Sequence, residues 1–182
     1  MIYILLAEGF EEVEAIAPID IMRRNGLDVV LAGVDGEEIC GAHSIKIATD
    51  INAENIKIED VEGIILPGGM PGTLNLQKNE TVNKLIKYCA ENELLIASIC
   101  AAPMILGELG LLDGKEAVCY PGFEKHLHGA DVCDCSVVVS DNFITAKGAG
   151  AALEFGAAIV DYFSGESGKG DEILSQMQYN LK

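Results

Sequence analysis

The sequence predicts a protein of the α/β class, with a mainly parallel sheet covered by helices on both faces. Short apolar runs alternate along the chain with longer segments of helical character, which is the pattern of strand–helix–strand units with right-handed crossovers. Glycine clusters follow several of the apolar runs, as expected where a buried strand gives way to a helix. At 182 residues and 49% hydrophobic content, the chain predicts a single domain, residues 1–182, with a full core.

The first third of the chain predicts two strands, one helix and a hairpin. Residues 2–7 and 28–33 form apolar runs, and the helix expected at 11–24 has acids in its first turn and arginines in its last, as the helix dipole prefers. Pro18 lies inside that helix and is expected to bend or break it locally. Asp35 and Gly36 fit a turn. That turn leads into an antiparallel pair, 38–40 against 45–48.

The middle third predicts two buried strands, each leading into a helix. Residues 63–66 are apolar and run into the glycine loop 67–72, and a helix follows at about 74–92 with a break near Asn79. Residues 94–99 are a short apolar run flanked by polar residues, which is typical of a strand buried on both faces. The next helix extends through Leu109, where Gly110 can end it.

The last third predicts further short strands and two helices. The expected elements are a strand at 116–119, a short helix within 121–129, an antiparallel pair at 137–139 and 143–146, an apolar helix from Gly150 to Phe163, and a helix near 171–179. A glycine-rich link joins the last two helices at 164–170.

Charge and composition exclude several classes of function. The net charge of −17 disfavours nucleic acid and anionic membranes as partners, and no apolar stretch reaches the length of a membrane span. The first residues lack a basic segment before Glu8, so they predict a strand and not a signal peptide. Six cysteines in such a chain are expected to be reduced thiols in the cytoplasm.

Three features follow the carboxyl ends of predicted parallel strands and are therefore expected on one rim of the sheet. They are the 8–10 turn, the 67–72 loop and Cys100. Cys100 stands between a strand and a helix that begins near Pro103, so helix N–H groups and the helix dipole are expected to favour its thiolate. It is a candidate nucleophile, and the alternative is a small buried hydrophobic residue.

Glu14 is the candidate partner of this thiol. Ala17 and Ile21 share its face of the predicted helix, so the carboxyl is expected to be desolvated and protonated near neutral pH. Such a group can donate a hydrogen bond to a thiolate or move protons on a bound carbonyl compound. Glu11 and Glu12 are explained as acids of the first helical turn, and an exposed Glu14 remains the alternative if Pro18 shifts the helix phase.

The loop after residue 66 offers backbone N–H groups without side-chain obstruction. Gly68, Gly69 and Met70, together with Ala101 after the cysteine, are candidates for an oxyanion hole that binds substrate. A phosphate or flavin cradle is a further alternative, although no G-x-G-x-x-G or Walker pattern is present. A plain tight turn explains the glycines equally well.

Several segments together resemble the ThiJ/PfpI (DJ-one) superfamily, and within it the DJ-one/YajL subgroup. The resemblance covers nearly the whole chain, and the segments that carry it are 11–26, Leu66-Pro67-Gly68-Gly69, 97–103 and 147–155. It implies a flavodoxin-like three-layer α/β/α sandwich, a homodimer, and a reactive cysteine and protonated glutamate that fall on Cys100 and Glu14.

The resemblance implies a cofactor-independent glyoxalase or deglycase acting on small dicarbonyls such as methylglyoxal and glyoxal, with a role in oxidative-stress protection. The alternative is a non-catalytic redox-sensing chaperone that uses oxidation of Cys100. No cofactor, nucleic acid or membrane partner is expected. Ala101 stands where the protease-like branch has histidine, so peptidase activity is not expected.

Two further positions depart from the family pattern and are candidate pocket residues. Tyr120 stands where some members have histidine, and His43 stands where close relatives have arginine.

A metal site is not predicted. His126 and His128, like Cys133 and Cys135, are separated by a single residue, which matches no familiar zinc spacing.

Overall fold

The computed structural model describes residues 1–34 and 36–179. Its centre is a seven-stranded sheet in the order β10-β11-β7-β6-β1-β2-β5, in which only β10 runs antiparallel to its neighbour. The strands are β1 (Ile2–Leu6), β2 (Val29–Gly33), β5 (Ile51–Asn52), β6 (Gly63–Leu66), β7 (Leu95–Ile99), β10 (Val137–Ser140) and β11 (Phe143–Ala146). The predicted α/β class with a mainly parallel sheet is confirmed.

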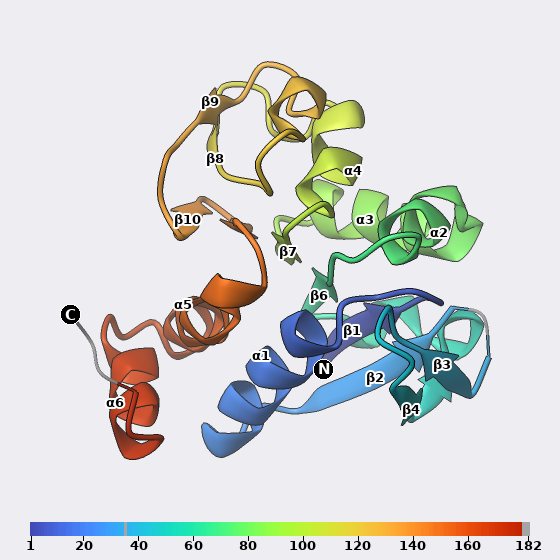
Figure 1. Ribbon diagram of the computed structural model, residues 1–182, viewed down its shortest axis with the longest axis horizontal. Coiled ribbons are helices and arrows are strands. Elements are labelled where there is room, and N and C mark those ends of the chain that lie inside the picture. Colours follow the sequence, from blue (N-terminus) through green and yellow to red (C-terminus); the bar gives the residue numbers. More distant parts are fainter. Residues whose placement is uncertain (35, 180–182) are drawn as a thin grey trace.

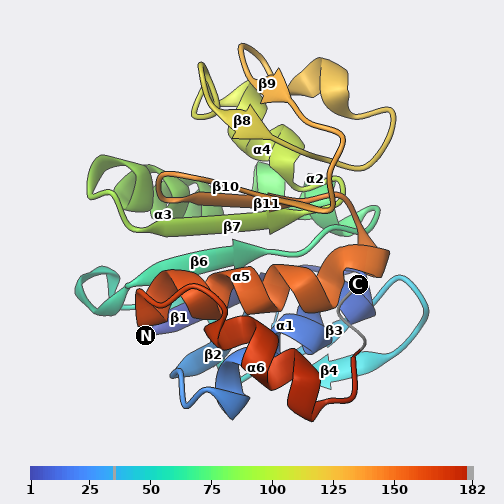
Figure 2. The same ribbon diagram turned by 90° about the vertical axis from the view of Figure 1, so that its left-hand side faces the viewer.

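Six α-helices of the described residues cover the two faces of this sheet (Figures 1 and 2). They are α1 (Glu12–Arg24), α2 (Gly72–Lys78), α3 (Glu80–Glu91), α4 (Pro103–Glu108), α5 (Ala152–Ser164) and α6 (Lys169–Gln176). Apolar side chains of α1, α5 and α6 pack in one core layer, and those of α2, α3 and α4 pack in the other. Buried strand residues alternate between these layers, since successive side chains of a strand point to opposite faces.

The order of the strands places a switch point between β1 and β6. From β1 the chain moves outward to β2 and β5, and then returns to the other side of β1 to form β6 and β7. The loops that leave the carboxyl ends of β1 and β6 therefore diverge toward opposite faces. In open α/β sheets the crevice at such a point is where ligands bind.

Most predicted helix boundaries are confirmed. Pro18 does not break the helix in which it lies. Helix α1 runs continuously from Glu12 to Arg24. A Cβ on Gly156 of α5 would lie 2.9 Å from the Cα of Pro18, so the two helices pack closely at this point. The predicted break at Asn79 is confirmed, because this residue ends α2 and its side chain accepts hydrogen bonds from the first N–H groups of α3.

The smaller elements differ more from prediction. The hairpin forms as expected, β3 (Glu38–Cys40) against β4 (Lys46–Ala48), while the turn expected at Asp35-Gly36 falls partly outside the described residues. The strand expected at 116–119 is reduced to β8 (Glu116–Ala117), which pairs in parallel with β9 (Asp131–Val132) outside the central sheet. The short helix expected within 121–129 is present as a single 3₁₀ turn, Glu124–His126.

Two strands of the described residues escaped sequence reasoning because each has only two residues. They are the edge strand β5 and the strand β9. Among the described helices, none has the length and apolar character needed to cross a membrane.

Candidate functional site

The three features predicted on one rim of the sheet meet there. The N–H of Glu11 donates to the carbonyl of Gly68 at 3.0 Å, and the N–H of Gly72 donates to the carbonyl of Gly9 at 3.2 Å. A Cβ on Gly68 would lie 2.6 Å from the Cβ of Cys100. The loops after β1, β6 and β7 are therefore in direct contact, and they surround Cys100 and Glu14.

Cys100 occupies a backbone conformation that is unusual for a side-chain-bearing residue. Its φ is +64°, in the left-handed region that costs non-glycine residues of order 1 kcal/mol or more. The conformation is held on both sides, because the Cys100 N–H donates to Ala146 at 2.8 Å and the Cys100 carbonyl accepts from Tyr120 at 2.8 Å. The turn between β7 and α4 thus presents a partly exposed thiol at the rim.

Glu14 is almost fully buried in α1, with 1% of its surface exposed. One carboxyl oxygen, Oε2, accepts the N–H of Gly68 at 2.9 Å, and the Cys100 side chain hydrogen-bonds to the same carboxyl. Burial raises the pKa of Glu14 to about 7, against the hydrogen bonds from Cys100, Gly68 and Ala149, which favour the charged form. The predicted desolvated carboxyl beside the thiol is present.

The ionisation of Cys100 is opposite to the sequence-based prediction. Burial, together with the charge and hydrogen bond of Glu14, raises the pKa of the thiol to about 12, against the N–H groups of Gly69 and Ala101, which act to lower it. Desolvation of the sulfur therefore outweighs the backbone donors. At neutral pH the thiol holds its proton and donates it toward Glu14, so the two groups share one hydrogen bond.

Only glycine fits at position 68, because the side chains of Cys100 and Glu14 leave no room for a Cβ there. Its absent Cβ would lie 2.6 Å from both the Cβ of Cys100 and the Oε2 of Glu14, closer than atoms approach without displacement. The N–H that the sequence assigned to an oxyanion hole is already donated to Glu14. Gly68 therefore brings backbone, thiol and carboxyl together.

The other predicted oxyanion-hole residues lie either beside the Cys100 sulfur or at the protein surface. Backbone donors of Gly69 and Ala101 are directed at Cys100. Gly69 has a φ of +87°, and a Cβ there would lie 2.4 Å from the Glu11 nitrogen, so glycine is needed for the loop to approach α1 this closely. Met70 is exposed.

Glu12 has a role that sequence reasoning missed. Its sequence position explains it only as a first-turn acid, but it is buried, and its Oε1 accepts the N–H groups of His43 at 2.8 Å and Ile45 at 3.4 Å. A Cβ on Gly41 would lie 2.3 Å from this oxygen. Burial acts to raise the pKa of Glu12, but the hydrogen bonds together lower it below its usual value.

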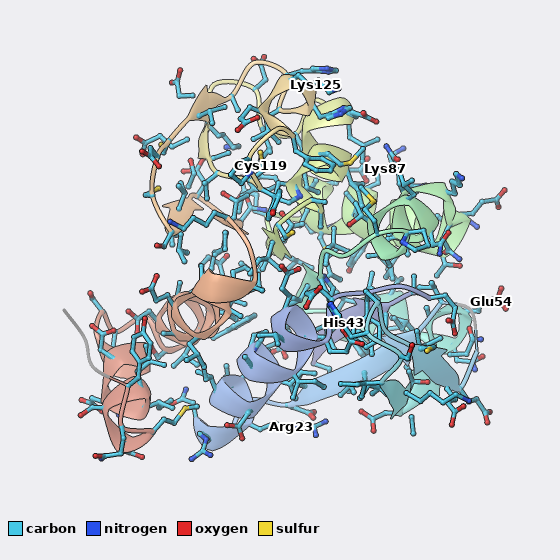
Figure 3. The ribbon with its side chains drawn as sticks, viewed as in Figure 1. Arg23, His43, Glu54, Lys87, Cys119 and Lys125 are labelled. Atoms are coloured by element: carbon cyan, nitrogen blue, oxygen red, sulfur yellow. The ribbon has the colours of Figure 1, made fainter. Side chains whose placement is uncertain are left out.

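His43 lies at the same rim, beside the beginning of α1 (Figure 3). Its Nδ1 is 2.9 Å from Glu12 and 3.6 Å from Glu11, and the hydrogen bond to Glu12 and the charges of both acids raise the pKa of the imidazole. Within the described residues this trio is the group of potential ligand atoms close enough to hold a metal, all within 4.8 Å. Mutual ion pairing explains their proximity, and we assign no metal to them.

Tyr120 is half-exposed and lies next to the turn that contains Cys100. Its N–H holds the Cys100 carbonyl, its ring lies over Gly148, whose Cβ would be 3.3 Å away, and Phe123 packs edge-on against it at 6.5 Å. No hydrogen bond of the tyrosine hydroxyl is found among the described residues. The ring therefore borders the site without contacting the thiol–carboxyl pair through a polar atom.

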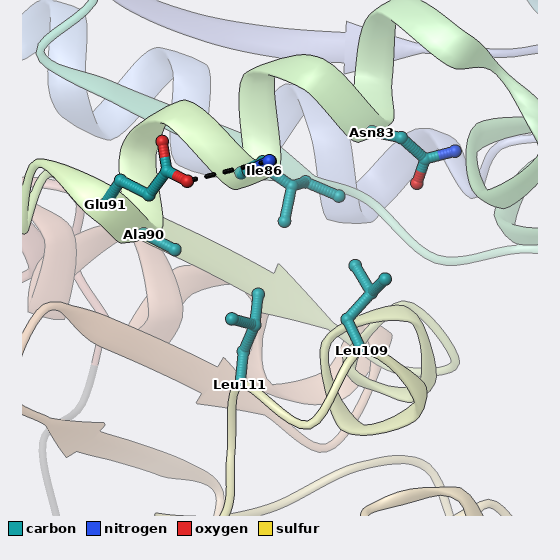
Figure 4. A pocket seen from close by; sticks show the side chains of 7 residues that line it. Asn83, Ile86, Ala90, Glu91, Leu109 and Leu111 are labelled. Carbon is teal, nitrogen blue, oxygen red and sulfur yellow. Dashed lines mark ion pairs between the residues drawn. The ribbon is translucent and has the colours of Figure 1, made fainter.

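A separate cavity lies away from this chemistry. An apolar groove of about 580 Å³ separates α3 from the segment after α4 (Figure 4). It is lined by Asn83, Ile86, Lys87, Ala90, Glu91, Leu109 and Leu111. Its charged groups, Lys87 and Glu91, pair with each other at 3.7 Å, and none of its lining residues contacts Cys100 or Glu14.

These features define a class: an α/β sandwich with a cysteine–carboxyl pair at the switch point of its sheet. A family model described as the DJ-1/PfpI family matches residues 1–162, and this chain belongs to that family. The resemblance inferred from the motifs is confirmed.

Curated relatives include proteins named for activities. The chain is 34% identical over 163 residues to the glutathione-independent glyoxalase DJR-1.2 of Caenorhabditis elegans, covering 89% of this chain and 87% of that one. It is 31% identical over 149 residues to the deglycase PYRAB04690 of Pyrococcus abyssi, covering 80% and 89%. Protein DJ-1 homolog B of Arabidopsis thaliana is 34% identical over 168 residues, which are 91% of this chain but only 38% of that longer protein.

Solved structures show the same fold. Toxoplasma gondii DJ-1 in its oxidized form superposes with a TM-score of 0.93 at 30% identity, over 99% of this chain and 98% of that one. A DJ-1 superfamily protein from Salmonella typhimurium, solved as a cysteine-to-alanine mutant, gives a TM-score of 0.92 at 29% identity over 99% and 98%.

Proposed function

We propose that this protein is a cofactor-independent glyoxalase or deglycase-type enzyme that converts small dicarbonyls such as methylglyoxal and glyoxal through Cys100. The observation that carries the proposal is the hydrogen bond between a partly exposed thiol and a buried carboxyl whose pKa is raised to about 7. Relatives named as a glyoxalase and a deglycase support the same substrate class.

The raised pKa of the thiol assigns Glu14 the role of general base in the first step. The Cys100 sulfur forms a bond to the aldehyde carbon while its proton passes to the Glu14 carboxylate, because a thiol with a pKa of about 12 is too weakly ionised to react unaided at neutral pH. Glu14 then passes this proton to the former aldehyde oxygen, which completes the hemithioacetal and restores the carboxylate. That oxygen accepts hydrogen bonds from the N–H groups of Gly69 and Ala101.

The later steps also need a group that both accepts and donates protons near neutral pH. Glu14 removes the proton from the former aldehyde carbon and returns it to the neighbouring carbon. The hydroxyl proton of the hemithioacetal passes to the neighbouring oxygen, so that the hemithioacetal becomes a thioester of the hydroxy acid. Water then cleaves the thioester, releasing the hydroxy acid and restoring the thiol. A carboxyl with a pKa of about 7 is suited to both directions of transfer.

Turnover of methylglyoxal by purified variants tests this proposal. Cys100→Ser is expected to lower kcat/KM by a factor on the order of 10³ or more, because serine is a far weaker nucleophile at this pH. Glu14→Gln is expected to lower it by about 10²–10⁴, the usual contribution of acid–base catalysis. Lactate formation is measured directly, so nonspecific consumption of the dicarbonyl by surface amines does not count.

Cys89→Ser is the matched control, since Cys89 is buried within α3 and contacts neither residue of the pair. Retention of parental turnover by this variant is expected. Parental lactate formation by Cys100→Ser would show that the chemistry proceeds elsewhere or not through a thioester.

The second candidate function is a redox sensor with chaperone activity that uses oxidation of Cys100. It is favoured by the same donors, because the N–H groups of Gly69 and Ala101 and the protonated form of Glu14 can bind the oxygens of a sulfinate. Mass spectrometry after mild peroxide treatment distinguishes the two. Selective oxidation of Cys100 in a protein that forms no lactate supports the sensor, whereas equal oxidation of all the thiols contradicts it.

We also propose that the protein is a homodimer and that it acts in the cytoplasm. Sedimentation of the purified chain tests the dimer, and a monomer at micromolar concentration would remove it from the proposal without affecting the chemistry.

A further inference from the structure

A second group of thiols lies outside the site of Cys100 and Glu14. Cys119, Cys133 and Cys135 line a pocket of about 250 Å³, together with Glu124 and Lys147. Cys119 follows β8, while Cys133 and Cys135 stand in the loop between β9 and β10. Figure 3 places Cys119 inside the part of the molecule that contains β8 and β9.

Within this group, Cys133 and Cys135 face each other. Their side chains form a hydrogen bond, the Cys133 Sγ is also 3.6 Å from the Asp131 carbonyl, and both residues are free and partly exposed. Cys119 is buried, with 4% exposure. The accessible thiols of this pocket are therefore the pair separated by one residue.

The backbone around the pair is anchored at its ends and irregular between them. The Cys133 N–H donates to Ala117 at 2.9 Å, and the Ser136 carbonyl accepts from Lys147 at 3.0 Å. Residues 134–136 form bends and belong to no helix or strand. A bend shortens the distance between the Cα atoms of residues two apart, which brings it within the range of about 4.4–6.8 Å that a disulfide spans.

We propose that Cys133 and Cys135 are a dithiol redox site, separate from Cys100. The two thiols form a reversible disulfide with each other by exchange with a small-molecule disulfide such as oxidised glutathione. One thiolate attacks the small disulfide, forming a mixed disulfide and expelling one thiol. The second protein thiolate then attacks the mixed disulfide and expels the other thiol. The protein loses two electrons and two protons, and the small disulfide is reduced to two thiols.

The surroundings of the two thiols in the pocket determine how fast this exchange occurs. Burial, and the neighbouring Cys133, Asp134 and Glu116, raise the pKa of Cys135, which slows attack because only the thiolate reacts. The ammonium of Lys147 is the one cation among the residues that line the pocket. Completeness depends instead on the proximity of the two sulfurs, which gives the second thiol a high effective concentration and favours ring closure over the mixed disulfide.

The Cys100 site does not share this chemistry, although the two sites share a wall. Residues 118, 119 and 121 line the dithiol pocket, and Tyr120 between them holds the Cys100 carbonyl. The partner of Cys100 is a carboxyl, whereas the partner of Cys133 is a thiol. Loss of one site is therefore expected to leave the other site's reaction in place.

Equilibration of the purified protein with glutathione buffers tests the proposal. After acid quenching and alkylation, mass spectrometry is expected to show a form that has lost two hydrogen atoms, with the bond mapped to Cys133 and Cys135. The ratio of oxidised to reduced protein is expected to fall fourfold when reduced glutathione is doubled at constant oxidised glutathione, because two thiols are released. A mixed disulfide would show only a twofold fall and a mass gain of one glutathione.

Variants separate the two sites. Cys133→Ser and Cys135→Ser are expected to abolish the transition, while Cys119→Ser and Cys100→Ser are expected to retain it. Lactate formation by Cys133→Ser is expected to equal that of the parent, so the result does not depend on the proposed function. A stable mixed disulfide in the parent protein, a bond mapped to Cys119, or a fourfold dependence that persists in Cys133→Ser would overturn the proposal.

Discussion

The thiols of Cys100 and Cys89 have similarly raised pKa values, but the backbone conformation and the polar groups around the two sulfurs differ. The pKa of each thiol is raised to about 12, with burial as the largest cause in both. Cys89 lies in regular helix α3 among apolar side chains, and no charged or hydrogen-bonding group adds to the effect of burial on its pKa. Cys100 lies at a turn with a φ of +64°, with a carboxyl and two backbone N–H groups directed at its sulfur.

A perturbed thiol pKa does not by itself identify a reactive cysteine. Desolvation acts on both residues, but only at Cys100 does the fold supply a group to receive the proton. A thiol with a high pKa and an adjacent base can react in one concerted step, while the same thiol in a hydrocarbon core has nowhere to send its proton. The functional difference therefore comes from Glu14.

The largest expected difference between the two regions is the dependence of stability on pH. Glu14 has its pKa raised from 4.5 to about 7 in the folded state, so the folded protein binds more protons than the unfolded chain in this range, and the free energy of unfolding falls as pH rises. Chemical denaturation of the parent and of Glu14→Gln at several pH values measures the effect. The difference between the two is expected to change by about 3 kcal/mol across this window.

Cys89 and Cys100 act on stability in a higher window, above the ordinary thiol value of 9.0, because their pKa values are also raised on folding. The substitution Cys89→Ser is therefore expected to leave the slope between pH 4.5 and 7 unchanged. Parallel curves for the parent and Glu14→Gln over that range would contradict the assignment of a raised pKa to Glu14.

Added volume at Gly68 is expected to have the next largest effect. A methyl group there meets Cys100 and Glu14 at 2.6 Å, so Gly68→Ala is expected to separate the pair and to lower turnover by a factor on the order of 10². Gly150→Ala is the control, because no atom lies within 4 Å of its Cβ position. Steady-state lactate formation and circular dichroism are the measurements. Full activity in a folded Gly68→Ala protein would mean that the close pairing is not needed.

The smallest effect concerns the alkylation of Cys100 by iodoacetamide above neutral pH. The carboxylate of Glu14 raises the pKa of the thiol by its charge and by accepting its hydrogen bond, so Glu14→Gln is expected to speed alkylation roughly tenfold at a given pH. Turnover of dicarbonyl falls in the same variant, which separates ionisation of the thiol from proton transfer. Slower alkylation would instead restore the original expectation that the pair favours a thiolate. Cys89 serves as the internal reference in the mass spectrum.

Much of the fold and part of the site could be predicted from residue order. Apolar runs and glycine clusters located β1, β6 and β7 and the loops that follow them, because burial on both faces and strand-to-helix turns leave local patterns. Glu14 was found because its helical neighbours are apolar. Glu12 was missed, since its partners at 41–45 are distant in sequence and its position in the first turn already had an adequate local explanation.

The order of residues predicts the parallel α/β architecture, the rim on which the loops gather, and the thiol and carboxyl of the candidate pair. Three features follow only from the folded structure: the thiol keeps its proton, the N–H of Gly68 binds Glu14, and Cys133 and Cys135 face each other in a pocket beside Cys119. The reason is physical: patterns of burial are periodic along the chain, whereas desolvation and charge act through space. Whether desolvation or a nearby charge has the larger effect on a given atom depends on its neighbours in space, and these cannot be read from the order of residues.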